Sequence, residues 1–295
     1  MIKKQILTIS FLATTFVGVA GEVDQVVNDT VRLNEVVVTG TMTEVNRKFL
    51  PMTVTSLDKQ ELQGRYTNSV LTALSEQVPG MFVTGRGVIG YGVANGAAGG
   101  MSIRGIGGSP NTQVLVLIDG HPQYMGMMGH PLPDAYESAM AEKIEVVRGP
   151  ASVLYGSNAM AGVVNIVTKK QQQDGVHTYG RAMYGSYNTF SAEAHNAFRR
   201  KGFSSFVSLN YNRTDGHREN SEFDQYGGYA KLGYEFFSHW NVFADVNVTH
   251  YNAANPGLVS APMIDNDAEI TRGMTSFALS NSYARTSGAL KFFYN

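Results

Sequence analysis

The segment from residue 121 to residue 133 concentrates side chains that bind soft or borderline metal ions. It reads His-Pro-Gln-Tyr-Met-Gly-Met-Met-Gly-His-Pro-Leu-Pro. Imidazole and thioether groups are ligands of haem iron and of copper. The alternative is that the methionines fill irregular gaps in a core and the histidines form local hydrogen bonds. The residue types leave the metal itself unknown. The side chains in question are His121, Tyr124, Met125, Met127, Met128 and His130.

Other catalytic or cofactor motifs are absent or incomplete. The run Gly85-Arg-Gly-Val-Ile-Gly90 matches the dinucleotide fingerprint, whose glycines must open a helix that holds pyrophosphate. The glycine-rich stretch after it cannot form that helix. There is no Gly-Lys-Ser/Thr loop, His-Glu-x-x-His pair or Gly-x-Ser-x-Gly elbow. The chain has no cysteine, which excludes disulfides, cysteine-ligated zinc, iron–sulfur clusters and thiol catalysis. We therefore predict no enzymatic activity and no resident cofactor.

Composition favours a protein of many strands. The 23 basic and 24 acidic residues leave no net field to attract nucleic acid, so we expect no nucleic-acid partner. Charged residues make up only 16% of the chain, whereas it has 32 glycines and 11% aromatic residues. That mixture suits strands joined by tight turns. No apolar run after the N-terminus is long enough for a transmembrane helix.

The first 20 residues have the pattern of a secretory signal peptide. Two lysines are followed by an almost unbroken apolar run from Ile6 to Ala20, with small residues at its end. A buried N-terminal helix is the alternative. A polar, unpatterned stretch follows, which is typical of a flexible tether, and then the β-branched run of residues 34–40. We predict an exported protein with a tether at residues 21–47.

Residues 48–170 have a mixed α and β pattern. Asn68 is positioned to cap a helix over residues 69–77, which Pro79-Gly80 would end. The continuous apolar run Val114–Ile118 predicts a buried strand, and residues 143–147 and 163–168 predict two more. One helical turn is expected at residues 150–155, with Gly156 as its C-cap.

From residue 171 the pattern changes to long segments of alternating polarity. Seven such segments are predicted, each about the 9–11 residues that a tilted strand needs to cross a bilayer. A soluble sandwich also alternates. Two features favour membrane strands: aromatic residues at strand ends, and connections that alternate between short and long. The aromatic residues are Tyr184, Phe190, Phe203, Tyr226, Phe236, Phe237, Trp240 and Tyr251. The predicted fold class is an α+β domain followed by antiparallel transmembrane β-strands.

Six segments between residues 34 and 170 resemble those of the TonB-dependent outer-membrane receptors, in the same order and spacing. Asn-Glu-Val-Val-Val-Thr-Gly at 34–40 is similar to the TonB box. Five further segments resemble the sequence signatures of that family's plug domain. They are residues 74–83, 101–105 (Met-Ser-Ile-Arg-Gly), 114–120, 144–150 (Ile-Glu-Val-Val-Arg-Gly-Pro) and 154–168. The resemblance implies a plug domain at 48–170 and the N-terminal part of a β-barrel at 171–295.

The TonB box also has a physical interpretation. An extended β-branched segment on a flexible tether suits strand addition to the edge of another protein's sheet. The alternative is that Val36–Val38 is only the first strand of the plug. The resemblance implies that TonB, powered from the inner membrane, captures the box and remodels the plug. The residues implied are Glu35, Val36, Val37, Val38 and Thr39.

The resemblance also suggests residue roles within the plug. Arg104 and Arg148, each before a glycine at a strand end, are expected at the plug–barrel seam, where a buried guanidinium needs carboxylate partners. Two solvated arginines are the alternative. Residues 121–130 are expected at the plug apex, which faces the ligand.

The implied function is import of a scarce ligand across the outer membrane of a Gram-negative bacterium, with the plug and N-terminus toward the periplasm. Ferric siderophore, haem and cobalamin are the expected ligands, and copper is a lesser alternative. Because receptors with plugged lumens have about 22 strands, we interpret the chain as truncated. A stand-alone periplasmic plug that binds ligand or TonB without transport is the alternative from another class.

Overall fold

The structure is a computed structural model that describes residues 36–37, 45–46, 52–58, 61–62, 67–85, 87–92, 98–108, 113–123, 132–263, 266–283 and 285–295. The description below concerns the unit Asn34–Asn295. The predicted signal peptide therefore lies outside the described residues. None of the helices in the described ranges is long and apolar enough to span a membrane.

A five-stranded sheet forms the centre of the N-terminal domain. Its order is β3 (Val54–Leu57), β9 (Ala141–Arg148), β10 (Gly162–Thr168), β7 (Val114–Ile118) and β8 (His121–Pro122). β10 runs parallel to β7, and the other pairs are antiparallel. Every residue of β7 is buried, as its continuous apolar sequence predicts for a strand covered on both faces. The strands predicted over 114–118, 143–147 and 163–168 are confirmed.

Shorter elements surround this sheet. Helix α2 (Val70–Gln77) buries Val70, Leu71, Ala73 and Leu74. Its N-cap is Ser69 rather than the predicted Asn68: Ser69 Oγ accepts from the backbone N–H of Leu71, and the Asn68 amide donates to Asp134 and Gln225. Helix α3 (Ser152–Tyr155) has Gly156 as its C-cap, as predicted. The remaining elements are the strands β4 (Met81–Val83), β5 (Met101–Ile103) and β6 (Ile106–Gly108), and the 3-10 helices η2 (Pro133–Ala135), η3 (Ser138–Met140) and η4 (Ser157–Ala159).

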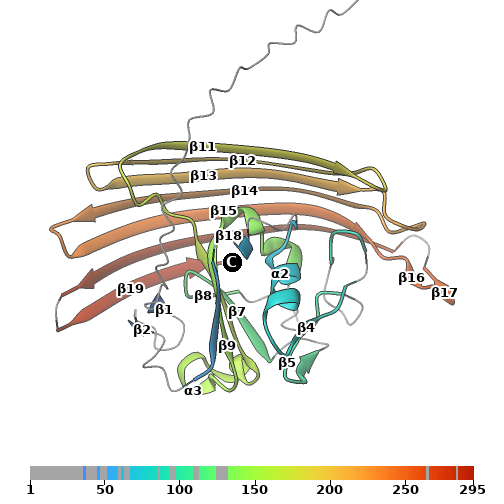
Figure 1. The fold of residues 1–295 in the computed structure, drawn as a ribbon, viewed down its shortest axis with the longest axis horizontal. Helices are drawn as coiled ribbons and strands as arrows, with labels where there is room; N and C mark the ends of the chain where they lie inside the picture. The colour runs from blue at the N-terminus through green and yellow to red at the C-terminus, as the bar shows by residue number, and fades with distance from the viewer. Residues whose placement is uncertain are drawn as a thin grey trace, which may run out of the picture. The chain divides into compact units, whose positions relative to one another are not determined.

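Seven long strands form one antiparallel sheet, which we call the wall (Figure 1). Each long strand pairs with the next long strand along the chain, so the predicted order of seven strands is confirmed. A two-stranded hairpin, β16 (Gly257–Leu258) with β17 (Ala261–Pro262), lies in the connection between β15 and β18. The wall strands are β11 (Gly175–Gly185), β12 (Thr189–Arg200), β13 (Phe203–Thr214), β14 (Phe223–Phe236), β15 (Trp240–Ala254), β18 (Asp267–Ser282) and β19 (Ser287–Tyr294).

The two faces of the wall differ in polarity. The outer face is exposed and largely apolar, and it includes Val207, Leu209, Leu232, Val246, Val248, Phe277, Leu290 and Phe292. The inner face is buried and largely polar, and it includes Ser204, Ser208, Asn210, Asn212, Gln225, Asp245, Asn247, Thr249 and Ser276. A water-soluble sheet would place these sets the other way round. Polar inside and apolar outside is the arrangement of strands that face lipid.

Two details differ from the sequence predictions. Tyr251, predicted in the aromatic belt, lies on the inner face with no exposed surface, with its ring 6.2 Å from that of Phe223. Five wall strands exceed the predicted length of about 9–11 residues, and the longest of them, β18, has 16 residues and pairs with β15 from its first residue, Asp267. The prediction matched strand length to the width of a bilayer, whereas backbone pairing continues beyond the apolar band because it does not depend on side-chain polarity.

Candidate functional site

Most of the residues predicted to contact metal or haem lie outside the described residues. His121 is described: it belongs to β8, is buried, and its Nε2 atom has no hydrogen-bond partner among the described residues. Burial lowers the pKa of the His121 imidazole, and the nearby Lys291 acts in the same direction. Within the described ranges, no three His, Cys, Asp or Glu side chains gather as a metal-binding group. The residues outside are Tyr124, Met125, Met127, Met128 and His130.

Of the predicted partner-binding residues, Val36 and Val37 form β1, which pairs antiparallel with β2 (Val45–Asn46). This pair is a sheet of its own and is not part of the five-stranded sheet. The alternative, that these valines are only the first strand of the domain, agrees with β1 being the first strand described, so the partner-binding role of this segment stays a prediction. The other three predicted residues, Glu35, Val38 and Thr39, lie outside the described residues.

The two predicted seam arginines lie at strand ends. Arg104 occupies the turn between β5 and β6 with a φ of 53° and an exposed side chain. Arg148 ends β9, and its Nη1 donates to the carbonyl oxygen of Pro79 at 3.1 Å. Their roles as ionic contacts to the wall stay a prediction.

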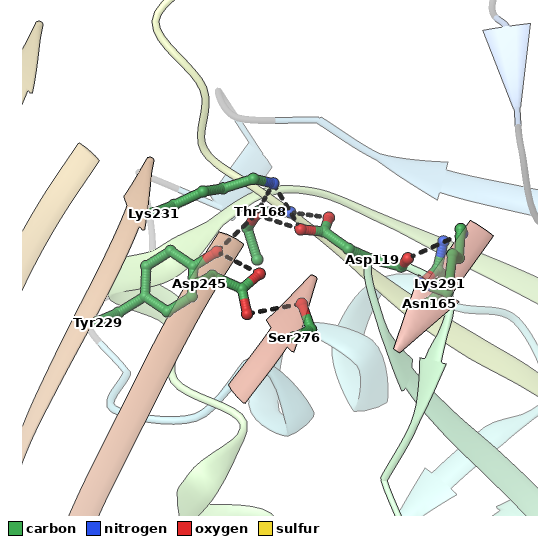
Figure 2. A network of polar contacts seen from close by, with 9 residues as sticks. Asp119, Asn165, Thr168, Tyr229, Lys231, Asp245, Ser276 and Lys291 are labelled. Atoms are coloured by element: carbon green, nitrogen blue, oxygen red, sulfur yellow. Dashed lines mark hydrogen bonds and ion pairs between the residues drawn. The ribbon is translucent and has the colours of Figure 1, made fainter. Parts of the chain in front are cut away.

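The N-terminal domain and the wall meet instead at a network around Asp119 (Figure 2). Asp119 follows β7 in a turn with a φ of 48°. Its Oδ1 accepts from the backbone N–H of Thr168 at 2.9 Å, and its Oδ2 accepts from Thr168 Oγ1 at 2.6 Å. Lys231 Nζ, on β14 of the wall, lies 2.6 Å from the same Oδ2 and 2.8 Å from Thr168 Oγ1. Two strand ends of the domain are thereby joined to the middle of the wall.

The wall extends this network with neutral and acidic partners (Figure 2). Tyr229 Oη lies 3.0 Å from Thr168 Oγ1 and 3.3 Å from Asp245 Oδ2. Ser276 Oγ donates to Asp245 Oδ1 at 2.7 Å. β14, β15 and β18 therefore all contribute to the contact, since these residues belong to one strand each.

The charge of Asp119 is stabilised by this arrangement. Burial on its own would raise the pKa of the carboxyl, but the Lys231 ammonium and the bonds from Thr168 outweigh it, so the pKa is below its ordinary value. The side chains of Lys231 and Asp119 are 12% and 10% exposed, so the pair is little screened by solvent. Removing one partner would leave a buried charge without compensation.

A second contact between the domain and the wall involves β13, β14 and β15, nearer to the long β13–β14 and β15–β18 connections. Glu137, the N-cap residue of η3, reaches the inner face, where Asn210 Nδ2 donates to its Oε2 at 2.5 Å and Thr249 Oγ1 contacts its Oε1. Beyond it, Gln225 Nε2 donates to the backbone carbonyl of Asp134 at 2.6 Å.

A third contact lies at the opposite end of the strands, near the short turns. Glu235 accepts from Lys170 Nζ at 2.6 Å and from Arg199 Nη2 at 2.5 Å. These side chains are partly exposed, at 36% for Lys170 and 38% for Glu235. Beside them is a cavity of about 150 Å³ whose lining includes Lys169, Lys170, Lys231, Phe206 and Phe243.

Sequence reasoning missed Asp119, Lys231 and Glu137. A usable signal existed for Lys231, which occupies a polar position of an alternating strand between Ala230 and Leu232 and so had to face inward. A lysine on the buried face of a sheet needs a carboxylate partner. The partner itself lies 112 positions earlier, and no local pattern identifies it.

Comparisons with known proteins agree with this architecture. Residues 46–163 match the family model described as the TonB-dependent receptor plug domain. An iron-regulated outer membrane virulence protein of Vibrio cholerae is 35% identical over 130 residues, which are 42% of this chain and 18% of that protein. The chain thus spans less than a fifth of that relative.

Solved structures show the same fold. The ferripyoverdine receptor of the Pseudomonas aeruginosa outer membrane matches with a TM-score of 0.65 and 13% identity, over 88% of this chain and 36% of that one. The siderophore receptor PiuA of Acinetobacter baumannii matches with a TM-score of 0.66 and 15% identity, over 84% of this chain and 37% of that one.

Proposed function

Since the chain belongs by its plug domain to the TonB-dependent receptors of the Gram-negative outer membrane, we propose that it takes part in energy-coupled import of a scarce ligand. In this proposal the plug closes the space behind the wall, a partner pulls on residues 35–39, and the plug contacts around Asp119 break to admit the ligand. The family consists of receptors and transporters, so the protein's work is binding and movement, with no covalent step.

The observation that carries the proposal is the polar character of the contact between plug and wall. Lys231, Glu137 and Lys170 reach their partners through hydrogen bonds and ion pairs. Water can replace such partners when the surfaces separate, so breaking a solvated polar contact costs far less than its strength in a dry interior. An interface of this kind can hold the plug at rest and still release it under load.

The proposed pulling point is the β1 segment. β1 and β2 are joined by only two residue pairs, Val36 with Asn46 and Val37 with Val45. So short a pairing is weak and leaves strand edges available. A partner that adds its own strand to this edge would gain main-chain hydrogen bonds, and the force would pass along the chain to β3 at Val54. TonB is the partner we propose for residues Glu35–Thr39.

The proposed ligand is a ferric siderophore, with haem and cobalamin as the alternative ligands. The matched relative is named as iron-regulated, one matched fold is named as a ferripyoverdine receptor and another as a siderophore receptor. Those names support an iron ligand. The plug segment from residue 121 onward, with its imidazole and thioether groups, is the proposed ligand-facing region.

Uptake by a strain that lacks its own iron-chelate receptors tests the proposal. The full gene product is expressed, and cells receive radiolabelled iron as ferric siderophores or haem, or labelled cobalamin. We expect uptake of one ligand, with loss of uptake but retained surface binding in Val37→Pro, because proline removes a main-chain donor from the added strand.

Val45→Pro is the matched control. It disrupts the same β1–β2 pairing from the other strand and leaves the proposed TonB-binding residues intact. We expect uptake to survive it. Loss of uptake in both variants, or in neither, contradicts the role of residues 35–39. Recovery of the protein in the soluble periplasmic fraction would instead support a stand-alone plug.

A further inference from the structure

Glu137 is a buried carboxyl group that has no cationic partner among the described residues. It is 1% exposed, and its backbone forms an isolated bridge with Ser69 inside the plug. Its side chain leaves the plug and enters the inner face of the wall between β13 and β15. Both of its side-chain contacts there, Asn210 and Thr249, are uncharged.

A glycine on β14 makes the space for this carboxyl group. A Cβ built on Gly227 would lie 2.8 Å from Glu137 Cδ and 3.0 Å from Asn210 Nδ2, which are both too close. Gly227 pairs with Asn210 on one side and with Thr249 on the other. The three residues therefore form a socket across β13, β14 and β15, and Glu137 fills it.

The socket suits a neutral carboxylic acid. Thr249 Oγ1 also lies 3.5 Å from Asn247 Oδ1, so the O–H of a neutral Glu137 can donate a hydrogen bond to this hydroxyl while the hydroxyl donates to Asn247. Burial raises the pKa of Glu137 to about 7, even though the bonds from Thr249 and Asn210 act in the opposite direction. In water the same group has a pKa of about 4.3.

The neighbouring titratable groups belong to other contacts. Asp134, three positions earlier, accepts from the backbone N–H groups of Tyr91 and Gly92. Tyr136 is fully buried beside it, and burial raises its pKa to about 12. From the wall, Tyr251 on β15 and Arg272 on β18 face this part of the plug, and Arg272 donates to Gln123 at 3.2 Å. Glu137 is the member of this group whose pKa is brought close to neutral pH.

We propose that Glu137 is a proton-dependent latch: as a neutral acid it seats the plug in the socket of Asn210, Gly227 and Thr249, and its ionisation loosens this part of the plug. The latch itself is a property of the plug–wall contact, and only its use in import rests on the proposed function. It is a positioning group for the plug and does not contact the ligand in this proposal.

A single cysteine can report how often the plug leaves the wall, because the chain has none of its own. Ser208 lies on the inner face of β13, is 2% exposed, and its Oγ has no hydrogen-bond partner among the described residues. Ser208→Cys therefore places a thiol beneath the plug without removing a described contact. Labelling of this thiol by a maleimide in isolated outer membranes, without ligand or energy source, measures spontaneous opening.

The pH profile distinguishes a latch from a merely structural residue. The labelling rate in the Glu137 protein is divided by that in Glu137→Gln at each pH, which cancels the pH dependence of the thiol. Because the pKa is higher in the seated plug, closure is favoured most below the solvated pKa and less as pH rises toward 7. We expect the ratio to rise about tenfold per pH unit between pH 5 and 7 and to level off above pH 7. A ratio that is flat from pH 5 to pH 8.5 overturns the proposal.

A disulfide tests the socket independently of the proton. In Glu137→Cys with Gly227→Cys, the side chain at position 227 points into the space that the Glu137 carboxyl group fills, because a Cβ there would lie 2.8 Å from Glu137 Cδ, and a disulfide between the two positions requires the plug to be seated. Combined with Ser208→Cys, the oxidised variant should form this bond and lose maleimide labelling at position 208 until a reductant is added. Failure of the bond to form in a protein that reaches the outer membrane contradicts the seating of Glu137. Loss of import in Val37→Pro has no bearing on either result, so the two proposals fail separately.

Discussion

Replacing Lys231 by methionine removes the positive half of the Asp119 contact and keeps most of the side chain's volume. In the variant, Asp119 keeps its two bonds from Thr168. It loses the ammonium group 2.6 Å away, which is the main influence that offsets its burial. A buried charge that loses its partner destabilises the folded contact by about 3–5 kcal/mol.

The cavity beside Lys231 decides where within about 3–5 kcal/mol we expect the destabilisation of the Lys231→Met variant to lie. Its volume of about 150 Å³ is large enough to hold water, and Lys231 is one of the residues that line it. Water drawn into the space left by the ammonium can hydrate Asp119, so we expect the lower end, about 3 kcal/mol. Since 1.4 kcal/mol is a factor of ten in an equilibrium, plug opening should increase by roughly a hundredfold at pH 7.

Maleimide labelling of the Ser208→Cys thiol measures this change directly. Lys170→Met is the matched control, because its pair with Glu235 is more than a third exposed and such pairs contribute about 0–1 kcal/mol. Adding Asp119→Asn to Lys231→Met should restore most of the closure by removing the uncompensated charge. If Lys231→Met labels no faster than the parent, or if Lys170→Met labels equally fast, the Asp119 network does not hold the plug.

Three further substitutions make separate predictions, all read as the thermal unfolding of the detergent-solubilised protein. Asp134→Asn should destabilise by about 1–3 kcal/mol, because an amide has a single acceptor oxygen, so either the backbone N–H of Gly92 or the amide of Asn68 loses its acceptor. Tyr251→Phe should stabilise by up to about 1 kcal/mol, because the buried hydroxyl has no partner among the described residues; a loss of stability would reveal a hidden partner. Gly90→Ala should destabilise by more than about 1 kcal/mol, since Gly90 has a φ of 85° and the added Cβ would lie 2.5 Å from Phe223 Cγ. An unchanged unfolding temperature there would mean that the Phe223 ring moves freely.

The elements of this chain are largely readable from its sequence because each is determined locally. The apolar run of β7 and the alternation of β13, β14 and β15 reflect which faces are buried, and that information lies in neighbouring residues. Strand ends were less accurate. β18 begins with Asp-Ala-Glu-Ile-Thr-Arg, whose charged residues resemble a loop although they continue a strand.

The plug–wall contacts could not be predicted in the same way because they join distant positions. Asp119 and Lys231 are 112 residues apart, and Thr249 meets Glu137 across the same separation. Their meeting depends on how the strands of the wall are registered against the plug. A shift of one residue in a strand would turn Lys231 to the outer face and remove the contact. Sequence alone identified polar inward positions but not their partners.

The two plug carboxyls show why burial alone does not determine a charge. Asp119 and Glu137 are both enclosed between plug and wall, yet the pKa of Asp119 is lowered and that of Glu137 is raised to about 7. The difference lies in the partner: an ammonium group from Lys231 for Asp119, and an amide and a hydroxyl for Glu137.

These opposite shifts give plug closure a pH optimum. The stabilisation of closure by Asp119 is present at neutral pH and is lost only as pH falls below the ordinary carboxyl range, whereas the stabilisation by Glu137 is lost as pH rises toward 7. Closure should therefore be tightest in mildly acidic conditions, where Asp119 is still charged and Glu137 is already neutral. A Lys231→Met, Glu137→Gln double variant should lose this optimum. If the labelling rate of the Ser208→Cys thiol in that double variant, divided at each pH by the rate for a fully exposed cysteine, still has its minimum near pH 5, some other group produces the optimum.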